Sequence, residues 1–398
     1  MSRLQRFTFP LKLPLAPHAL FQHFANEEGA LLLDSSDDSG LTSLCLRPSE
    51  IITHDIFDDL SPLRAKLNEG PKDAVKSFQG GFAGYFSYDL RCVSKIKKLA
   101  DSIPLLYMGF YTDILNYDPY AKLYYLTLLR ESRYAAERDY KDWVAELGAI
   151  KDTTPAPHPP VKWQPDWDKA DYLSKIARVI EYIYAGDIFQ ACIAQRWQAD
   201  LPASFAPYAY YRQLTSQSPA PYGGYLNMGG AQLLTNSPES FLSLDHTRRI
   251  LTKPIKGTAP RKLDEQEDQK QAQTLLMSEK DRAENAMIVD LMRNDLSRVA
   301  ERGSIAVTGF CELESYKNVH HLVSSVSAKL AEGQDIFDLL AATLPGGSIS
   351  GAPKIRAMEI IEEIEATPRG PYCGALGYIN TSGEAQFNIL IRTMVTSE

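Results

Sequence analysis

The stretch Lys253-Pro254-Ile255-Lys256-Gly257-Thr258-Ala259-Pro260-Arg261 decides how the second half of this sequence is interpreted. Pro254 disfavours helix at the residue before it, and Gly257 lets the backbone come close to a ligand. Lys256 is therefore predicted to lie in an extended segment, from which its amine can point into a cleft. A desolvated lysine can lose its charge and act as a nucleophile, although most Lys-Gly pairs are solvated turns.

Length, composition and charge narrow the class of protein. With 398 residues, 44% hydrophobic and 23% charged, the chain exceeds one ordinary core and has the make-up of a soluble globular protein. A net charge of −8 without a Lys/Arg block excludes a nucleic-acid surface, and no apolar run is long enough to span a membrane. The cysteines form no CxxC pair and predict reduced thiols in a cytoplasmic protein. They are Cys45, Cys92, Cys192, Cys311 and Cys373.

A proline-rich stretch divides the sequence into two regions. Residues 153–165 begin with Thr-Thr-Pro-Ala-Pro-His-Pro-Pro and predict a stiff linker. The region before it, residues 1–152, predicts a β-rich unit with strands at 80–88 and 123–129. The region after it, residues 166–398, carries the motifs that have chemical character.

Helical and extended segments alternate at the start of the second region. Asp168 and Gly186 are the predicted N-cap and C-cap of a helix between them. Residues 188–197 are predicted to follow as a strand that contains Gln190. This side chain is either a satisfied core amide or a group that faces a ligand.

Two pairs of titratable residues stand out in this region, and the first is a candidate metal site. Asp281 and Glu284 are three residues apart in a predicted helix, so they share one face and could hold a hard metal ion. Their spacing fits surface ion pairs with neighbouring basic residues at least as well. His320 and His321 are neighbours in a predicted strand and point to opposite faces, so we expect one to be buried and the other solvated.

Two further features lie near the end of the sequence. Residues 344–354, Leu-Pro-Gly-Gly-Ser-Ile-Ser-Gly-Ala-Pro-Lys, open a predicted helix whose free N–H groups suit a phosphate or carboxylate. Residues 372–379 and 385–395 predict a hairpin whose second strand presents Arg392. A guanidinium in this setting needs an acidic partner or a carboxylate ligand.

Together these motifs resemble one family. The matching stretches are Gly186 to Gln190, Ser237 to Glu239, Pro254 to Thr258, Asp281 to Asn285, His321 to Ser324, Gly346 to Lys354 and Ile391 to Thr393. Over residues 168–398 the sequence is similar to the chorismate-utilising enzymes, which include the anthranilate and isochorismate synthases. Residues 1–152 are similar to the N-terminal region of anthranilate synthase component I. The resemblance implies an α+β fold of two large packed antiparallel β-sheets flanked by helices.

Position 256 separates the reactions of this family. The anthranilate and isochorismate synthases carry a small residue there, whereas the aminodeoxychorismate synthases carry a lysine that attacks the chorismate ring at C2. The resemblance therefore implies that Lys256 is the nucleophile and that Glu239 is the general acid for the leaving hydroxyl. It also implies that His321 faces the ring and that Gln190 replaces the basic lysine of the water-adding members. The expected reaction converts chorismate and ammonia into 4-amino-4-deoxychorismate, for p-aminobenzoate and folate synthesis.

Binding residues and partners follow from the same resemblance. The implied substrate contacts are Gly257, Thr258, Ser348, Gly351, Tyr372 and Arg392. The implied Mg²⁺ ligands are Glu284 and Asp281, and a tryptophan pocket would involve Ser35, Pro221, Tyr222 and Gly223. Because no cysteine lies in a Gly-x-Cys-x-Gly motif, ammonia is expected from a separate glutamine amidotransferase subunit.

The resemblance stops short of the family's C-terminal segment. The sequence ends at Glu398, whereas relatives continue with a glycine-rich turn and a helix that carries two more acidic metal ligands. Without that segment, metal binding is expected to be weak. Two alternatives stay open: anthranilate synthase component I, and a binding subunit that keeps the fold without turnover.

Overall fold

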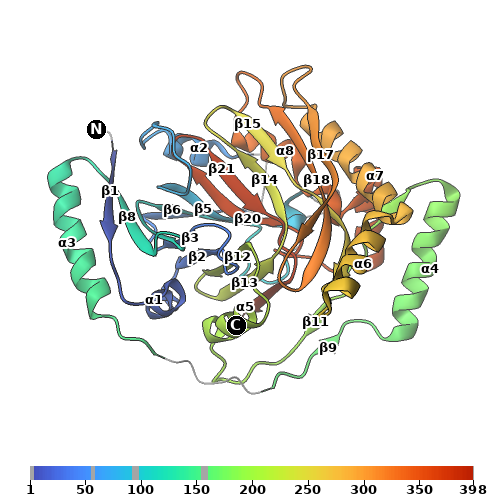
Figure 1. The fold of residues 1–398 in the computed structure, drawn as a ribbon, viewed down its shortest axis with the longest axis horizontal. Helices are drawn as coiled ribbons and strands as arrows, with labels where there is room; N and C mark the ends of the chain where they lie inside the picture. Colours follow the sequence, from blue (N-terminus) through green and yellow to red (C-terminus); the bar gives the residue numbers. More distant parts are fainter. Residues whose placement is uncertain (1–3, 55–58, 92–97, 154–159, 398) are drawn as a thin grey trace.

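The computed structural model describes residues 4–54, 59–91, 98–153 and 160–397, which form two large antiparallel sheets (Figure 1). The smaller sheet contains β1 (Gln5–Leu11), β2 (Leu31–Asp34), β3 (Thr42–Cys45), β7 (Asp113–Asp118), β8 (Leu123–Arg130), β12 (Tyr222–Asn227), β13 (Ala231–Ser237) and β22 (Thr393–Ser397). The larger sheet contains β4 (Glu50–His54), β5 (Gly81–Phe86), β6 (Leu106–Tyr111), β14 (Ser240–Leu244), β15 (Arg249–Thr252), β16 (Ile255–Pro260), β17 (Ala306–Ser315), β18 (Val319–Lys329), β20 (Ala375–Asn380) and β21 (Ala385–Asn388).

Strand order interleaves the two halves of the sequence. The smaller sheet runs β1-β8-β7-β3-β2-β12-β13-β22, and the larger runs β16-β18-β15-β14-β21-β20-β5-β6-β4, with β17 paired to β18. Each sheet therefore contains strands from both sides of the predicted linker, of which residues 154–159 lie outside the described part of the chain. The expected α+β architecture of packed antiparallel sheets is confirmed.

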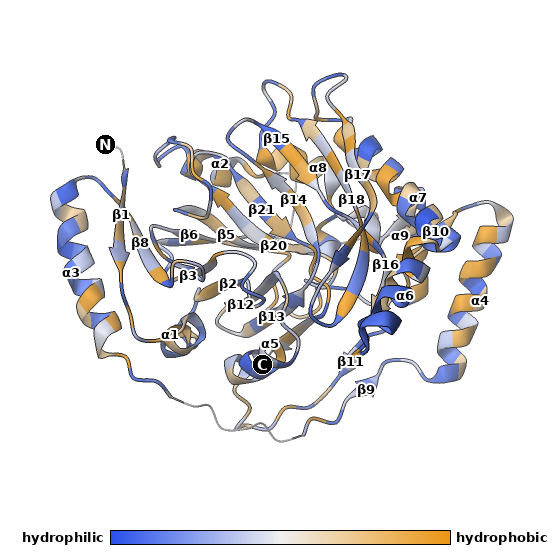
Figure 2. Ribbon diagram, in the orientation of Figure 1, coloured by the Kyte–Doolittle hydropathy of each residue, from blue (hydrophilic) through white to orange (hydrophobic). Residues whose placement is uncertain are grey.

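The described helices lie outside the two large sheets. They are α1 (Pro17–Phe24), α2 (Ser61–Leu67), α3 (Arg133–Ala149), α4 (Lys169–Ala185), α5 (Pro207–Gln217), α6 (Glu265–Leu276), α7 (Glu279–Leu296), α8 (Ile336–Thr343) and α9 (Lys354–Glu365). Most of them pack on a sheet face, whereas α4 stands apart from both sheets and packs on α9 (Figure 1). None of them combines the length and the apolar character that crossing a bilayer requires. Figure 2 shows that α6 is strongly hydrophilic, in keeping with its place on the outside of the molecule.

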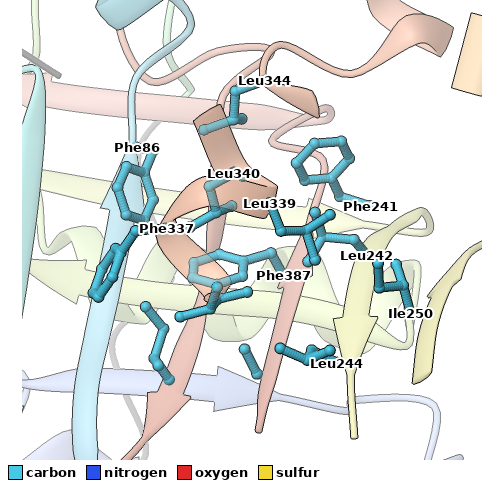
Figure 3. Packing of buried hydrophobic residues seen from close by; sticks show 14 of the residues in the cluster. Phe86, Phe241, Leu242, Leu244, Ile250, Phe337, Leu339, Leu340, Leu344 and Phe387 are labelled. Carbon is cyan, nitrogen blue, oxygen red and sulfur yellow. The ribbon is translucent and has the colours of Figure 1, made fainter. Parts of the chain in front are cut away.

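Three apolar layers hold the sheets and helices together. Buried side chains of both sheets, such as Leu31, Tyr85 and Leu233, pack between them. On the outer face of the larger sheet, Phe337 and Leu340 of α8 meet Phe86, Leu242 and Phe387 (Figure 3). A third cluster packs α1, α3 and α5 on the smaller sheet. Burial of this kind contributes about 25 cal/mol for each Å² of apolar surface removed from water.

Two predicted strands are wrong. Residues 188–197 do not form one strand. They contain the two-residue strand β10 (Gln190–Ala191), which pairs with β19 (Gly351–Ala352). Their last residue begins β11 (Trp197–Gln198), which pairs with β9 (Gln164–Pro165). Residues 385–395 form two strands in different sheets, because β21 pairs with β14 and β20 whereas β22 pairs with β13. The chain crosses between the sheets at residues 389–392.

Candidate active site

Lys256 extends from an irregular part of β16. The register between β16 and β18 shifts between the pairs Ile255–Val323 and Thr258–His321, and Gly257 lies between them with a φ of +96°. This local irregularity frees Lys256 from regular pairing. Its Nζ atom donates a hydrogen bond to the main-chain oxygen of Ser348 at 2.9 Å and lies 3.9 Å from the Sγ atom of Cys192.

Glu239 is a buried carboxyl beside this lysine. It lies between β13 and β14 and is only 4% exposed. Burial raises its pKa to about 7, although the Ser348 hydroxyl, the N–H of Ile255 and the charge of Lys256 all favour its ionised form. The Ile255 N–H donates to the Oε1 atom at 3.4 Å. A carboxyl in this state can carry a proton at neutral pH, which a general acid requires.

The glycine-rich loop passes close to both groups. It contains the short 3₁₀ turn Gly347–Ile349 and then β19, which pairs with β10. At Gly351, where φ is +156°, an added Cβ would lie 2.2 Å from the Gln190 main-chain oxygen. The Gln190 side-chain oxygen is buried and has no hydrogen-bond partner within the described residues. A bound substrate could supply that missing donor.

His321 faces the same region from β18. Its Nδ1 atom is 2.8 Å from the Thr258 hydroxyl, and its ring packs edge-on against Tyr316. Burial and the nearby Arg392 lower its pKa, so the ring is neutral at physiological pH. Its Nε2 atom is buried without a partner in the part of the chain that is described.

The expectation that one of the adjacent histidines is solvated is wrong. His320 and His321 are both only 3% exposed. His320 points to the other face of β18, where its Nε2 atom lies 3.1 Å from Asp268 of α6. The covering helix supplies a polar partner, so both faces of this strand are buried.

The two candidate metal ligands lie on the first turns of α7. Ser278 caps this helix by accepting the N–H of Asp281 at 3.3 Å. Asp281 packs on Gly257, because a Cβ built there would be 3.1 Å from the Asp281 Cβ. Glu284 is 3.9 Å from the Lys280 ammonium. The described residues contain no group of three acidic, histidine or cysteine side chains that could hold a metal ion.

Tyr372 and Arg392 complete the predicted substrate contacts. The neighbouring Cys373 and burial raise the pKa of the Tyr372 hydroxyl, which therefore stays protonated. Arg392 does not belong to a strand: its φ is +51°, and its main-chain oxygen accepts the N–H of Asn236 at 3.1 Å. No ion pair to Arg392 occurs among the described residues, so its guanidinium is available for an anionic ligand.

The residues of the predicted tryptophan pocket also come together, at a separate place. Ser35, Pro221, Tyr222 and Gly223 line one cavity of about 260 Å³, which residues of central strands of both sheets border, Asn388 among them. The Asn388 amide donates to the Tyr222 main-chain oxygen at 2.7 Å. The structure thus brings these four residues together at one cavity.

Two buried ion pairs near the site were missed by sequence reasoning. Arg369 pairs with Glu365 at 2.6 Å, and Lys354 pairs with Asp295. Arg369 lies in a Thr-Pro-Arg-Gly turn, which is typical of an exposed loop, so its sequence context gives no signal of burial. The sequence predicts only that Cys192 is a reduced thiol, yet its Sγ atom lies 3.9 Å from the Lys256 amine. Cys45, Cys192, Cys311 and Cys373 are free, while Cys92 lies outside the described residues.

Comparison with known proteins places this geometry in a family. The family model for chorismate binding enzymes matches residues 24–398. Anthranilate synthase component 1 of Thermus thermophilus is 40% identical over 81% of this chain and 70% of its own. Aminodeoxychorismate synthase component 1 of Escherichia coli is 40% identical over 80% of this chain and 69% of its own.

Solved structures agree with the sequence comparison. Anthranilate synthase component I from Streptococcus pneumoniae superposes with a TM-score of 0.78 at 28% identity, over 96% of this chain and 90% of its own. The menaquinone-specific isochorismate synthase from Escherichia coli has the same fold, with a TM-score of 0.77 at 18% identity, over 100% of this chain and 86% of its own. The chain belongs to the chorismate binding enzyme family and is a chorismate-utilising synthase.

Proposed function

We propose that this chain is the chorismate-binding subunit of an aminodeoxychorismate synthase. It would convert chorismate and ammonia into 4-amino-4-deoxychorismate, a precursor of p-aminobenzoate and folate. The observation that supports this choice is Lys256 itself, an amine held 2.9 Å from the Ser348 main-chain oxygen beside the buried carboxyl of Glu239. A lysine and a protonated carboxyl are the nucleophile and the acid that replacement of a ring hydroxyl needs.

The proposed reaction has two displacements. The Lys256 amine, in its neutral form, attacks the ring at C2, both conjugated ring double bonds shift toward C4, and the C4 hydroxyl takes a proton from Glu239 and leaves as water. Ammonia then attacks C4, both double bonds shift back, and the Lys256 amine is released. Proton return to Glu239 from the incoming ammonia restores the starting state.

Binding of the dianionic substrate falls to groups around the loop. Arg392, the N–H groups of the glycine-rich loop and the Tyr372 hydroxyl would contact its carboxylates. Gln190 and His321 each present a buried atom that has no partner among the described residues and that could contact the ring substituents.

Asp281 and Glu284 would hold a Mg²⁺ ion, because this ion is often bound by only one or two protein carboxylates. When bound, Mg²⁺ would neutralise carboxylate charge on the substrate. Ammonia would come from a separate glutamine amidotransferase subunit. Tryptophan would bind in the cavity that Ser35 and Tyr222 line.

Product identity tests the proposal. The purified chain is incubated with chorismate, an ammonium salt and MgCl₂, and the product is identified by chromatography and mass spectrometry. 4-Amino-4-deoxychorismate is the expected product. Anthranilate would instead assign the chain to the anthranilate synthases, whose Thermus thermophilus member is equally similar. Binding of chorismate without any product would indicate a subunit that lacks turnover.

A further inference from the structure

The Lys256 amine is held between two separate segments of chain. One is the glycine-rich loop, which supplies the Ser348 main-chain oxygen at 2.9 Å. The other is the segment after β10, which places the Cys192 Sγ atom 3.9 Å from the amine. The position of the amine therefore depends on how these two segments lie against each other.

The two segments pair directly through β10 and β19 and through the Cys192 N–H, which donates to the Ser350 main-chain oxygen at 2.8 Å. A buried guanidinium also bridges them. Arg369 is 7% exposed and donates to the Ile349 main-chain oxygen at 3.1 Å and to the Cys192 main-chain oxygen at 2.6 Å. Ile349 directly follows Ser348, and Cys192 carries the thiol that touches the amine. Both supports of the Lys256 amine are thus fixed to one planar group.

The surroundings of Arg369 hold that group in one orientation. Glu365 accepts two of its N–H groups at 2.8 and 2.6 Å, and the same carboxylate accepts the Ala194 N–H at 2.7 Å. The guanidinium lies over the Tyr88 ring, 4.5 Å from its centre. The Asp89 carboxylate accepts the main-chain N–H of Arg369 at 3.2 Å and that of Gly370 at 2.6 Å.

Stability alone is a weak reason for a buried ion pair, because desolvation offsets much of the attraction. The planar fork of arginine, in contrast, donates in fixed directions that a lysine ammonium cannot reproduce. We propose that Arg369 is a positioning residue that, through the Ile349 and Cys192 carbonyls, sets where the Lys256 amine stands. This inference rests on the proposed function for its kinetic consequence, but its geometric consequence is independent of that function.

The geometric test uses o-phthalaldehyde, which condenses with one amine and one thiol in contact to give a fluorescent isoindole and water. In the wild-type chain the expected product joins Lys256 to Cys192, as identified by peptide mass mapping and by its loss in Cys192→Ser. In Arg369→Lys and Glu365→Gln this product should form at least about tenfold more slowly. Arg130→Met is the matched control: it removes a partly buried arginine of the smaller sheet that pairs with Asp113 of β7 and Asp139 of α3, and it should react like wild type.

The kinetic test follows chorismate turnover in the same variants. A displacement of the amine by about 1 Å can lower the rate of the chemical step about a hundredfold. We therefore expect kcat to fall by about that factor in Arg369→Lys while KM for chorismate changes less than about threefold. Arg369→Met is a more severe variant; if it fails to fold in thermal unfolding, Arg369→Lys and Glu365→Gln carry the test.

The outcomes separate this inference from the proposed function. Unchanged isoindole formation in Arg369→Lys, or none in wild type, would overturn the positioning role whatever the kinetics show. An equal loss in Arg130→Met would also overturn it, since general loosening would then explain the result. Slower isoindole formation in Arg369→Lys, together with no chorismate product from wild type, would support the positioning role and contradict the proposed function.

Discussion

The Nζ atom of Lys256 donates to the Ser348 main-chain oxygen at 2.9 Å, across 92 residues of sequence. The lysine belongs to an edge strand of the larger sheet, and the oxygen belongs to the glycine-rich loop that precedes α9. This contact brings the candidate nucleophile to the loop whose N–H groups suit an anion. The Ser348 hydroxyl also acts to lower the pKa of the buried Glu239 carboxyl, so one residue bears on both groups of the proposed reaction.

Replacement of the nucleophile is the first prediction. Lys256→Ala should abolish the covalent chorismate adduct, because Lys256 is the amine that lies beside Glu239 and the loop. Intact-protein mass spectrometry after incubation with chorismate, without ammonia, measures the adduct. Lys329→Ala removes a lysine that pairs with Glu301 at the far end of β18 and should keep the adduct. An adduct that survives in Lys256→Ala would assign the attack to another group.

Removal of the acid is the second prediction. Glu239→Gln should lower kcat by at least about a hundredfold and change KM little, since an acid acts mainly in the transition state. In the wild type, kcat should fall as pH rises above about 7, because the raised pKa of Glu239 marks where it loses its proton. Steady-state kinetics between pH 6 and about 9 measure both effects. A variant with a raised KM and a normal kcat would make Glu239 a binding residue.

The third prediction concerns stability and follows from the same carboxyl. The pKa of Glu239 is about 7 in the folded chain, against an ordinary value of 4.5. Between these two pH values Glu239 holds more protons in the folded chain than in the unfolded chain. Its contribution to the free energy of unfolding therefore falls as pH rises. Glu239→Gln removes this dependence. The free energy of unfolding of Glu239→Gln, taken relative to that of the wild type, should therefore increase by about 3 kcal/mol between pH 4.5 and pH 7 and then level off.

Denaturant unfolding of both forms at several pH values measures that difference. Subtracting the two curves cancels the other titrating groups, which are common to both proteins. A difference that stays constant across the range would show that Glu239 is ionised in the folded chain, in conflict with its proposed role as an acid.

The fourth prediction concerns the glycine-rich loop. Gly351→Ala should destabilise the chain by about 1–3 kcal/mol or displace the loop, because its backbone conformation is strained for alanine. The new Cβ would also lie 2.2 Å from the Gln190 main-chain oxygen. Gly148→Ala is the matched control, since nothing lies within 4 Å of its Cβ position in α3. Thermal unfolding and chorismate turnover measure the two effects, and wild-type values for Gly351→Ala would contradict the close packing of β10 and β19.

Metal binding is the fifth prediction. Glu284→Gln should weaken Mg²⁺ binding at least about tenfold, or ~1.4 kcal/mol. In the wild type, chorismate should strengthen Mg²⁺ binding, and Mg²⁺ should strengthen chorismate binding by the same factor. Asp290→Asn, an exposed change on the same helix, should have no effect. Isothermal titration calorimetry, with and without chorismate, measures the Mg²⁺ dissociation constants of the wild type and of both variants. Equal Mg²⁺ affinity in Glu284→Gln and wild type would remove the site from this turn of α7.

Local signals in the sequence determined several elements to the residue. Asp168 caps α4 by accepting the Asp171 N–H, and Gly186 ends it with a φ of +83°, both as predicted. The extended segment around Lys256 is β16, and residues 354–365 form the helix expected after the glycine-rich loop. Caps, prolines and glycines act over a few residues, so their effect can be judged without the rest of the fold. The ordered motifs, and the family resemblance that they carry, indicated the packed sheets.

Tertiary structure decided what depends on distant partners. Residues 385–395 form two strands because β14 pairs with the first part of the segment and β13 pairs with the last part. Arg392 lies between them, where the chain passes from one sheet to the other. His320 and His321 are both buried because α6 brings Asp268 to the first and β16 brings Thr258 to the second. Arg369 is buried because Glu365, Ile349 and Cys192 converge on it from three segments. A side chain's burial and pairing depend on these long-range neighbours, which no local pattern contains.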